Sequence, residues 1–422
     1  MPANDVPAVP SALLPNININ GSPDHVTATL ADALLEHGPG HHAVLTTTQL
    51  AAYKSVALVT MPVFMAYACL FALQGKVRRE LGITCSDCAA AHEFGAAVSS
   101  LYVGNLTFRL AHNVVFSALR PHNRALLAMG CLMGSLSLIS IGVFRLGIHN
   151  TALVSLAYFL GGVGVGTFEP SLLSAVAPLG ARTTMWATLG IPLGIVCVTV
   201  GSFVLMGPLG VAVTTIYASV VALLGLGMLT LAFCIPYTHT PGNGGGVRAF
   251  YADLRDWRLW LPQIRRHAAV LAIDMFCVSA FSPGVLLYVF SEDVALWGDT
   301  TVSHDLFFAV YDLGTFLGGM TSRRLAYIDP VARDPLSFLP LLAMGVAINC
   351  YKYAPLCPLG GFLIFFANGS IYNHTCKQID QHVGSALSLT ALSFWLFLGD
   401  FGSVGGSNIM PYLRVWVGAG RA

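Results

Sequence analysis

Long apolar stretches recur along this chain, separated by short polar segments. Most are about twenty residues long, the length that an α-helix needs to cross a bilayer. The pattern predicts a bundle of eleven transmembrane helices in a 6+5 arrangement, divided by a longer polar segment. The expected spans are 52–74, 94–119, 125–146, 152–178, 185–206, 211–235, 268–290, 302–324, 336–351, 359–375 and 383–402.

The segments outside these spans complete the predicted organisation. Residues 1–50 lack Lys and Arg and carry scattered Pro, Asn and Gly, so we expect a disordered tail with a weak helix over 26–35. We expect a six-helix bundle at 51–236, a linker at 237–266, a five-helix bundle at 267–408 and a tail at 409–422. Because Trp257, Trp260 and Leu261 could share one face beside arginines, the linker is predicted to hold an interfacial helix, with a plain solvated linker as the alternative.

Composition supports a membrane protein and gives no argument for nucleic acid. Hydrophobic residues make up 55% of the 422 residues and charged residues 10%, against roughly 25% charged in soluble domains. The mean hydropathy is +0.70, and the net charge is +1. Loops after even-numbered spans hold twelve Lys and Arg against seven on the other side, which predicts a cytoplasmic N-terminus. We expect a multi-pass protein of the plasma membrane or an organelle membrane, with the lipid bilayer as a partner.

Ionisable residues inside the predicted spans are the main functional candidates, because hydrocarbon penalises them unless a partner or a cavity relieves the cost. Asp312 lies in the eighth span, and Glu169 stands just before Pro170 in the fourth. Pro170, and Pro192 between two glycines in the fifth span, predict interrupted helices like those at the sites of secondary transporters.

The remaining intramembrane residues each have two interpretations. Arg109 either neutralises a buried acid or contacts a solute, and Asp274 lies either at the membrane interface or in a cavity. We expect His112 to be a satisfied core residue. Asp400 is expected to be hydrated near the outer end of the eleventh span.

No motif in the chain indicates an enzyme, a metal site or a cofactor. There is no HExxH, GxSxG or Walker sequence, and Cys85-x-x-Cys88 has no second CxxC to complete a zinc site. On an oxidising side of the membrane, that loop could form a disulfide with Cys350 or Cys357. We therefore expect a non-enzymatic protein without cofactor.

Several local sequences resemble the equilibrative nucleoside transporter family. They are Phe168-Glu169-Pro170-Ser171, Gly190 to Gly194, Phe308-Ala-Val-Tyr311-Asp312, and Phe366-Ala367-Asn368-Gly369. The resemblance covers most of the membrane region and implies a major-facilitator-like bundle with one helix fewer. It departs from the family at Phe316, where the family has an Arg that is thought to hold ribose hydroxyls with the Asp.

The resemblance implies a transporter that moves a small polar solute by alternating access, with a nucleoside or nucleobase as the leading substrate. The expected substrate-binding residues are Asp312, Tyr311, Asn368, Asp274, Glu169 and Arg109. A protonatable Glu169 would also permit coupling to protons. The alternatives are a major-facilitator-like carrier of another solute and a membrane receptor or scaffold that transports nothing.

Overall fold

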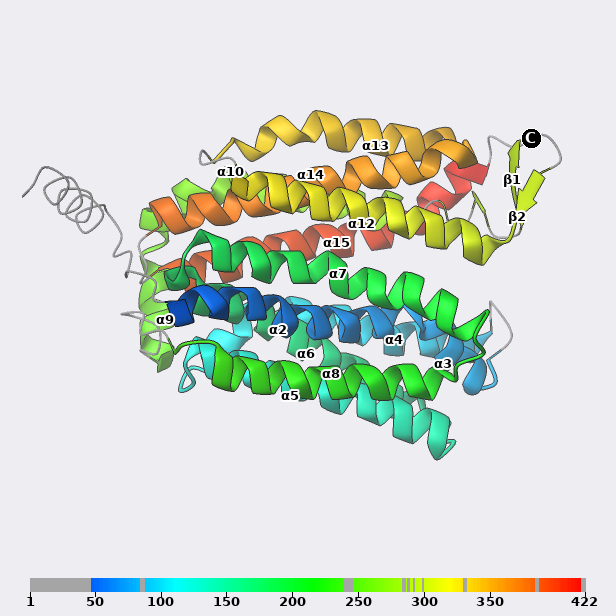
Figure 1. Cartoon of the computed structure of the whole chain (residues 1–422), viewed down its shortest axis with the longest axis horizontal. Helices are drawn as coiled ribbons and strands as arrows, with labels where there is room; N and C mark the ends of the chain where they lie inside the picture. The colour runs from blue at the N-terminus through cyan, green and yellow to red at the C-terminus, as the bar shows by residue number, and fades with distance from the viewer. Residues whose placement is uncertain are drawn as a thin grey trace, which may run out of the picture. The chain divides into compact units, whose positions relative to one another are not determined.

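The computed structural model describes residues 47–83, 88–237, 246–282, 286, 289–290, 293–297, 300–328, 332–383 and 387–418. These residues form helices and one antiparallel hairpin of β1 (Val294–Trp297) and β2 (Thr300–Val302) (Figure 1). The expected weak helix at 26–35 lies outside the described residues, and α2 begins at Thr47, inside the expected tail.

The first set of helices runs up to the linker. It comprises α2 (Thr47–Ala72), α3 (Gln74–Glu80), α4 (Ala89–Val115), α5 (Pro121–Ser137) with the π-helix η2 (Leu138–Arg145), α6 (Thr151–Val176) with the short η3 (Ala177–Leu179), α7 (Ala181–Met206) and α8 (Val213–Cys234). The linker contributes α9 (Gly246–Arg255).

The second set follows. It comprises α10 (Trp257–Phe281), α12 (His304–Ile328), the short η4 (Pro335–Phe338) with α13 (Leu339–Tyr351), and the short η5 (Ala354–Leu356) with α14 (Cys357–His382) and α15 (Ser388–Gly418).

Every predicted span overlaps one of these helices, while several boundaries differ. Among the described helices, six are long and apolar enough to cross a membrane by themselves: those at 54–72, 121–145, 151–179, 181–206, 213–234 and 354–382. The number eleven therefore stays a prediction. The seventh helix begins at Trp257 and ends at Phe281 rather than at residue 290, and the last helix continues into the expected tail.

The two helices with predicted interruptions, α6 and α7, are continuous, so these predictions are wrong. Pro170 lies inside α6 and Pro192 inside α7. Each proline removes one backbone donor. Packing against neighbouring helices allows a transmembrane helix to continue through such a site.

Helices pack in the same order within each set. In the first set α2 packs on α7 and α4 packs on α6; in the second set α10 packs on α15 and α12 packs on α14 (Figure 1). Glycines bring each pair into backbone contact. A Cβ on Gly162 would meet the carbonyl oxygen of Leu101, and one on Gly318 would meet that of Phe362. Small residues at such positions allow tight packing between transmembrane helices.

Contacts between the two sets involve fewer helices, chiefly α7 with α12 and α4 with α15. The linker helix α9 touches both sets, through α4, α10 and α15. The tryptophans of the predicted interfacial helix differ in burial: Trp257 is exposed, whereas Trp260 is buried and donates from Nε1 to the carbonyl oxygen of Asp253 (2.9 Å). The interfacial helix stays a prediction. Both tryptophans belong to the start of α10.

The cysteines of the outer loops do not pair as one alternative proposed. Cys88 is disulfide-bonded, whereas Cys350 and Cys357 are free thiols. Cys85 lies outside the described residues. The predicted pairing of this loop with Cys350 or Cys357 is therefore wrong.

Candidate functional site

Arg109 on α4 lies at the centre of a buried charge cluster. Its Nη2 is 2.6 Å from Oε2 of Glu169 on α6, and its Nε is 2.5 Å from Oδ2 of Asp400 on α15. The first pair lies within the first helix set, and the second joins the two sets. Arg109 thus neutralises buried acids, which was one of its two predicted roles.

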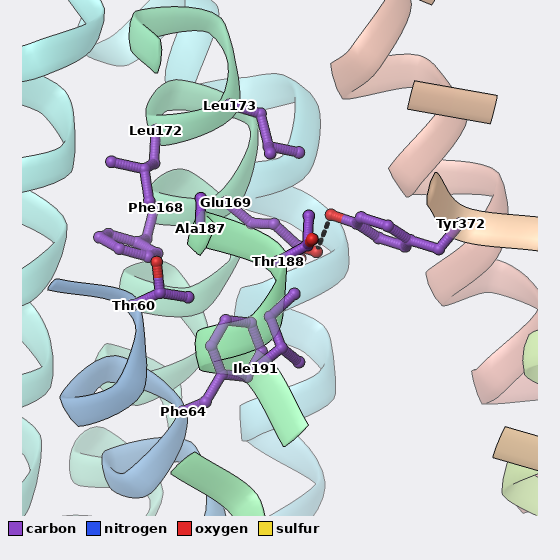
Figure 2. Close-up of a pocket in the computed structure, with 10 residues that line it drawn as sticks. All are labelled: Thr60, Phe64, Phe168, Glu169, Leu172, Leu173, Ala187, Thr188, Ile191 and Tyr372. Carbon is purple, nitrogen blue, oxygen red and sulfur yellow. Dashed lines mark hydrogen bonds between the residues drawn. The ribbon is translucent and has the colours of Figure 1, made fainter. Parts of the chain in front are cut away.

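Glu169 also receives a hydrogen bond from the second set. The hydroxyl of Tyr372 on α14 donates to Oε1 of Glu169 at 2.5 Å, and Figure 2 shows the tyrosine reaching across to the carboxylate. The carboxylate is therefore held by a guanidinium from its own helix set and by a phenol from the other. Sequence reasoning missed Tyr372, because a tyrosine in an apolar span carries no charge that would single it out.

A small cavity adjoins Glu169. It is lined by Thr60, Phe64, Phe168, Glu169, Leu172, Leu173, Ala187, Thr188, Ile191 and Tyr372 (Figure 2). Its volume of about 10 Å³ is close to that of a single water-sized sphere. In this conformation the cavity is too small for a nucleoside.

Asp274 and Asn368 form a second buried polar pair, inside the second helix set. The amide of Asn368 donates from Nδ2 to Oδ2 of Asp274 (2.7 Å), and Asp274 is fully buried. This burial favours the interior of the second helix set over an exposed position for Asp274. Oδ1 of Asp274 has no hydrogen-bond partner among the described residues.

Asp312 and Tyr311 lie apart from this cluster. The hydroxyl of Tyr311 contacts that of Ser282 and accepts a hydrogen bond from Asn349 (3.1 Å), which places its side chain among helices of the second set. Asp312 lies close to Thr199 of α7. Arg323 lies eleven residues after Asp312 on α12, and Glu169 acts on Arg323 electrostatically. The helix rises about 16 Å between Asp312 and Arg323, at 1.5 Å per residue. The structure therefore does not bring Asp312 together with Glu169.

The structure shows whether Asp400, His112 and Arg323 have the surroundings that the sequence predicted. Asp400 is paired and only 12% of its side chain is exposed, so the prediction of a hydrated residue is wrong. His112 is fully buried and its Nδ1 lies 2.8 Å from the carbonyl oxygen of Phe108, although its Nε2 has no partner among the described residues. Arg323, counted in the sequence among loop cations, is 96% buried on α12.

No group of three or more His, Cys, Asp or Glu side chains able to hold a metal ion occurs in the part of the chain that the structure describes. The cluster around Arg109 is instead an arrangement of paired charges and hydrogen bonds.

No family model matches this chain, and no curated protein matches it. Its fold is similar to those of solved transporters. The Escherichia coli fucose:proton symporter FucP is 15% identical over 88% of this chain and 93% of that chain, with a TM-score of 0.63. FucP in the outward conformation, described as a Major Facilitator Superfamily transporter, is 15% identical over 87% and 92%, with a TM-score of 0.62.

The human organic anion transporter MFSD10 (TETRAN) is 14% identical over 87% of this chain and 94% of that chain, with a TM-score of 0.63. At these identities the likeness concerns the fold. The chain thus has an all-α, major-facilitator-like membrane fold, as predicted. The resemblance to equilibrative nucleoside transporters remains an interpretation of the motifs.

Proposed function

We propose that this protein is a membrane transporter that moves a small polar solute by alternating access. The observation that carries the proposal is the joining of the two helix sets through buried polar side chains. Arg109 pairs with Asp400, Tyr372 binds Glu169, and Asn113 donates to Ser393 between the two helix sets. Intramembrane charges with partners on opposite sides of a bundle are typical of solute pathways.

The packing of the helices supports the same mechanism. Within each set, glycines hold paired helices in backbone contact, so each set can move as a rigid unit. Between the sets, a few ion pairs and hydrogen bonds must break for the interface to open. Rocking of one set against the other would then expose the cluster to either side of the membrane.

The scaffold alternative predicts polar residues that are paired off in a dry interface, and the Arg109 pairs by themselves would satisfy it. The unpartnered buried atoms favour the transporter. Asp274 Oδ1, Arg323 Nε, Ser171 Oγ and both amide atoms of Asn373 lack partners among the described residues. Buried polar atoms cost about 1–3 kcal/mol each when unpaired, which a purely structural interface gains nothing by keeping.

The motifs propose a nucleoside or nucleobase as the solute, and this finer proposal rests on them alone. Uptake of radiolabelled uridine and hypoxanthine into transport-deficient cells tests it. Asp312→Ala should lower uptake at least tenfold if Asp312 contacts the nucleoside. If neither compound is transported although the protein is expressed normally in the membrane, the nucleoside and nucleobase proposal is excluded. The alternative of a carrier for another solute then remains.

A further inference from the structure

The two helix sets share the same spacing of glycine contacts and arginines, around Arg109 in the first set and Arg323 in the second. A Cβ on Gly104 of α4 would meet the carbonyl oxygen of Phe159, as one on Gly318 of α12 would meet that of Phe362. Five residues after each glycine stands an arginine, Arg109 in the first set and Arg323 in the second.

The same register relates the partners of these arginines on α6 and α14. Ten residues after Phe159 stands Glu169, and ten residues after Phe362 stands Tyr372. The position that holds a carboxylate beside Arg109 therefore holds an uncharged phenol beside Arg323. The guanidinium of Arg323 lies 5.7 Å from the centre of the Tyr372 ring.

The remaining pairs of helices follow the same pattern. Gly190 of α7 packs against α2, and Gly402 of α15 packs against α10, each backbone to backbone. Two residues before them stand Thr188 and Asp400. Asp400 binds Arg109, so Thr188 occupies the equivalent position for Arg323. The two positions equivalent to the carboxylates that hold Arg109 thus carry neutral hydroxyls, Tyr372 and Thr188, and Figure 2 shows these two side chains lining one cavity with Glu169.

Arg323 is a buried cation with an unused donor. Its Nε has no hydrogen-bond partner among the described residues, and its Nη1 reaches only the carbonyl oxygen of Gly319, at 3.4 Å. Asp274 and Glu169 act on it electrostatically. Neither forms an ion pair with it within 4.0 Å, in contrast to the contacts of Arg109.

Glycines leave room for the Arg323 guanidinium at the interface. A Cβ at Gly319 or at Gly369 would come within 3.1 Å of its Nη1, and the one at Gly319 would also come within 3.4 Å of Pro192 on α7. The space that these glycines leave for the guanidinium therefore lies where the two helix sets meet. A group that enters this interface when the sets separate would encounter the free edge of the guanidinium.

We propose that Arg323 binds a carboxylate of the transported solute, in the place that protein carboxylates occupy beside Arg109. A guanidinium presents donors in a fork that matches a carboxylate, and a desolvated one forms strong charge-assisted bonds. A cationic solute would meet like charge at this edge. This assignment rests on the proposed function and defines the solute class as an organic anion. Asp274 and Glu169 are the acids that act electrostatically on Arg323, so a bound anion would lie in their neighbourhood.

Matched pairs of probes isolate the carboxylate. Orotate is uracil with a carboxylate, and nicotinate differs from nicotinamide by a carboxylate in place of an amide. Binding of each compound is measured on purified full-length protein, as wild type, Arg323→Gln, Arg323→Lys and the control Arg324→Gln, which changes the exposed neighbouring arginine. Thermal unfolding of each variant establishes that it is folded.

We expect at least one anion to bind the wild type at least tenfold more tightly than its neutral counterpart. Arg323→Gln should remove that preference, Arg323→Lys should retain part of it, and Arg324→Gln should leave it intact. Equal binding of anion and neutral partner, a preference that survives Arg323→Gln, or no binding of any probe to the wild type would overturn the assignment.

Transport and anion binding can fail separately. Binding that depends on Arg323, without uptake of the bound probe into vesicles, would contradict the proposed transport and keep the anion site. Uptake of a neutral solute that is indifferent to Arg323→Gln would contradict the anion site and keep transport.

Discussion

The contact between Tyr372 and Glu169 is the smallest unit on which the closed interface depends. A hydrogen bond to a charged group contributes about 1.5–3 kcal/mol. It joins α14 to α6, which belong to different helix sets. Loss of this one hydroxyl should therefore weaken the interface without changing the fold of either set.

Tyr372→Phe should lower the free energy of unfolding in detergent by about 1–3 kcal/mol. Tyr158→Phe is the matched control, because Tyr158 is as buried but its hydroxyl has no partner among the described residues. The control should be neutral or stabilising, because it removes a buried hydroxyl that has no partner among the described residues. Equal effects of the two changes would contradict the assigned contact.

Arg109 should be more sensitive than Tyr372, because it compensates two buried carboxylates. Arg109→Gln leaves Glu169 and Asp400 without their cation and should cost about 3–5 kcal/mol. Adding Asp400→Asn removes one of the uncompensated charges and should restore part of that loss. Chemical denaturation of both single variants and the double variant measures the coupling; strictly additive effects would argue that the ion pair contributes nothing.

Coupling to protons is tested at Glu169, the acid that both helix sets hold. If Glu169 carries a proton through the cycle, uptake should depend on pH, and Glu169→Gln should make it independent of pH. Asp253→Asn on α9 is a control acid outside the membrane spans, and burial raises its pKa. Uptake that ignores both pH and Glu169→Gln would exclude this coupling.

At the scale of helices, the proposed mechanism requires each set to move as a unit, and glycine contacts between paired helices are expected to provide this rigidity. A side chain at Gly162 would meet the backbone of α4 at Leu101. Gly162→Ala should therefore force α4 and α6 apart and cost about 1–3 kcal/mol.

Gly201→Ala on α7 is the control, because nothing lies within 4 Å of its added Cβ. It should be neutral or slightly stabilising by helix propensity. Thermal unfolding of both variants decides; a tolerated Gly162→Ala would remove the backbone contact as the source of rigidity.

The positions of helices followed from the sequence because hydrocarbon permits few other structures and length alone identifies a span. Boundaries did not follow where a helix continues past its apolar part, as α10 does at Trp257 and α15 does towards Gly418. The prolines led to a wrong prediction of interrupted helices. A proline in the sequence indicates a missing backbone donor, but it does not show whether packing against neighbouring helices lets the helix continue.

The site was predictable only in part. Glu169, Arg109 and Asp274 stood out as ionisable residues in apolar spans, and Asn368 through the resemblance to a family motif. Asp400 stood out as well, but its burial was not predicted, and Arg323 and Tyr372 were not singled out, because burial of a residue depends on how helices from distant parts of the chain meet. The repeat that relates Arg109 to Arg323 is carried by glycine contacts rather than by similar sequence.

At the scale of the molecule, the account requires that the two helix sets exchange between arrangements. Contacts join the two helix sets at different places along the helices. Arg109 and Asp400 meet where α4 approaches α15, and Asp312 lies near Thr199 where α12 passes α7. Alternating access requires that these two regions open in turn, since simultaneous opening would leave a continuous pore.

Distances between spin labels across the two sets test this claim most directly. Exposed positions for one end are Leu205 and Leu306, and for the other end Val115 and Ile328. The account predicts two distance populations for each pair, with variants such as Tyr372→Phe lengthening the distance at one end while the other end stays closed. A single unchanging distance at both ends, in the wild type and in these variants, would contradict a transporter that works by alternating access.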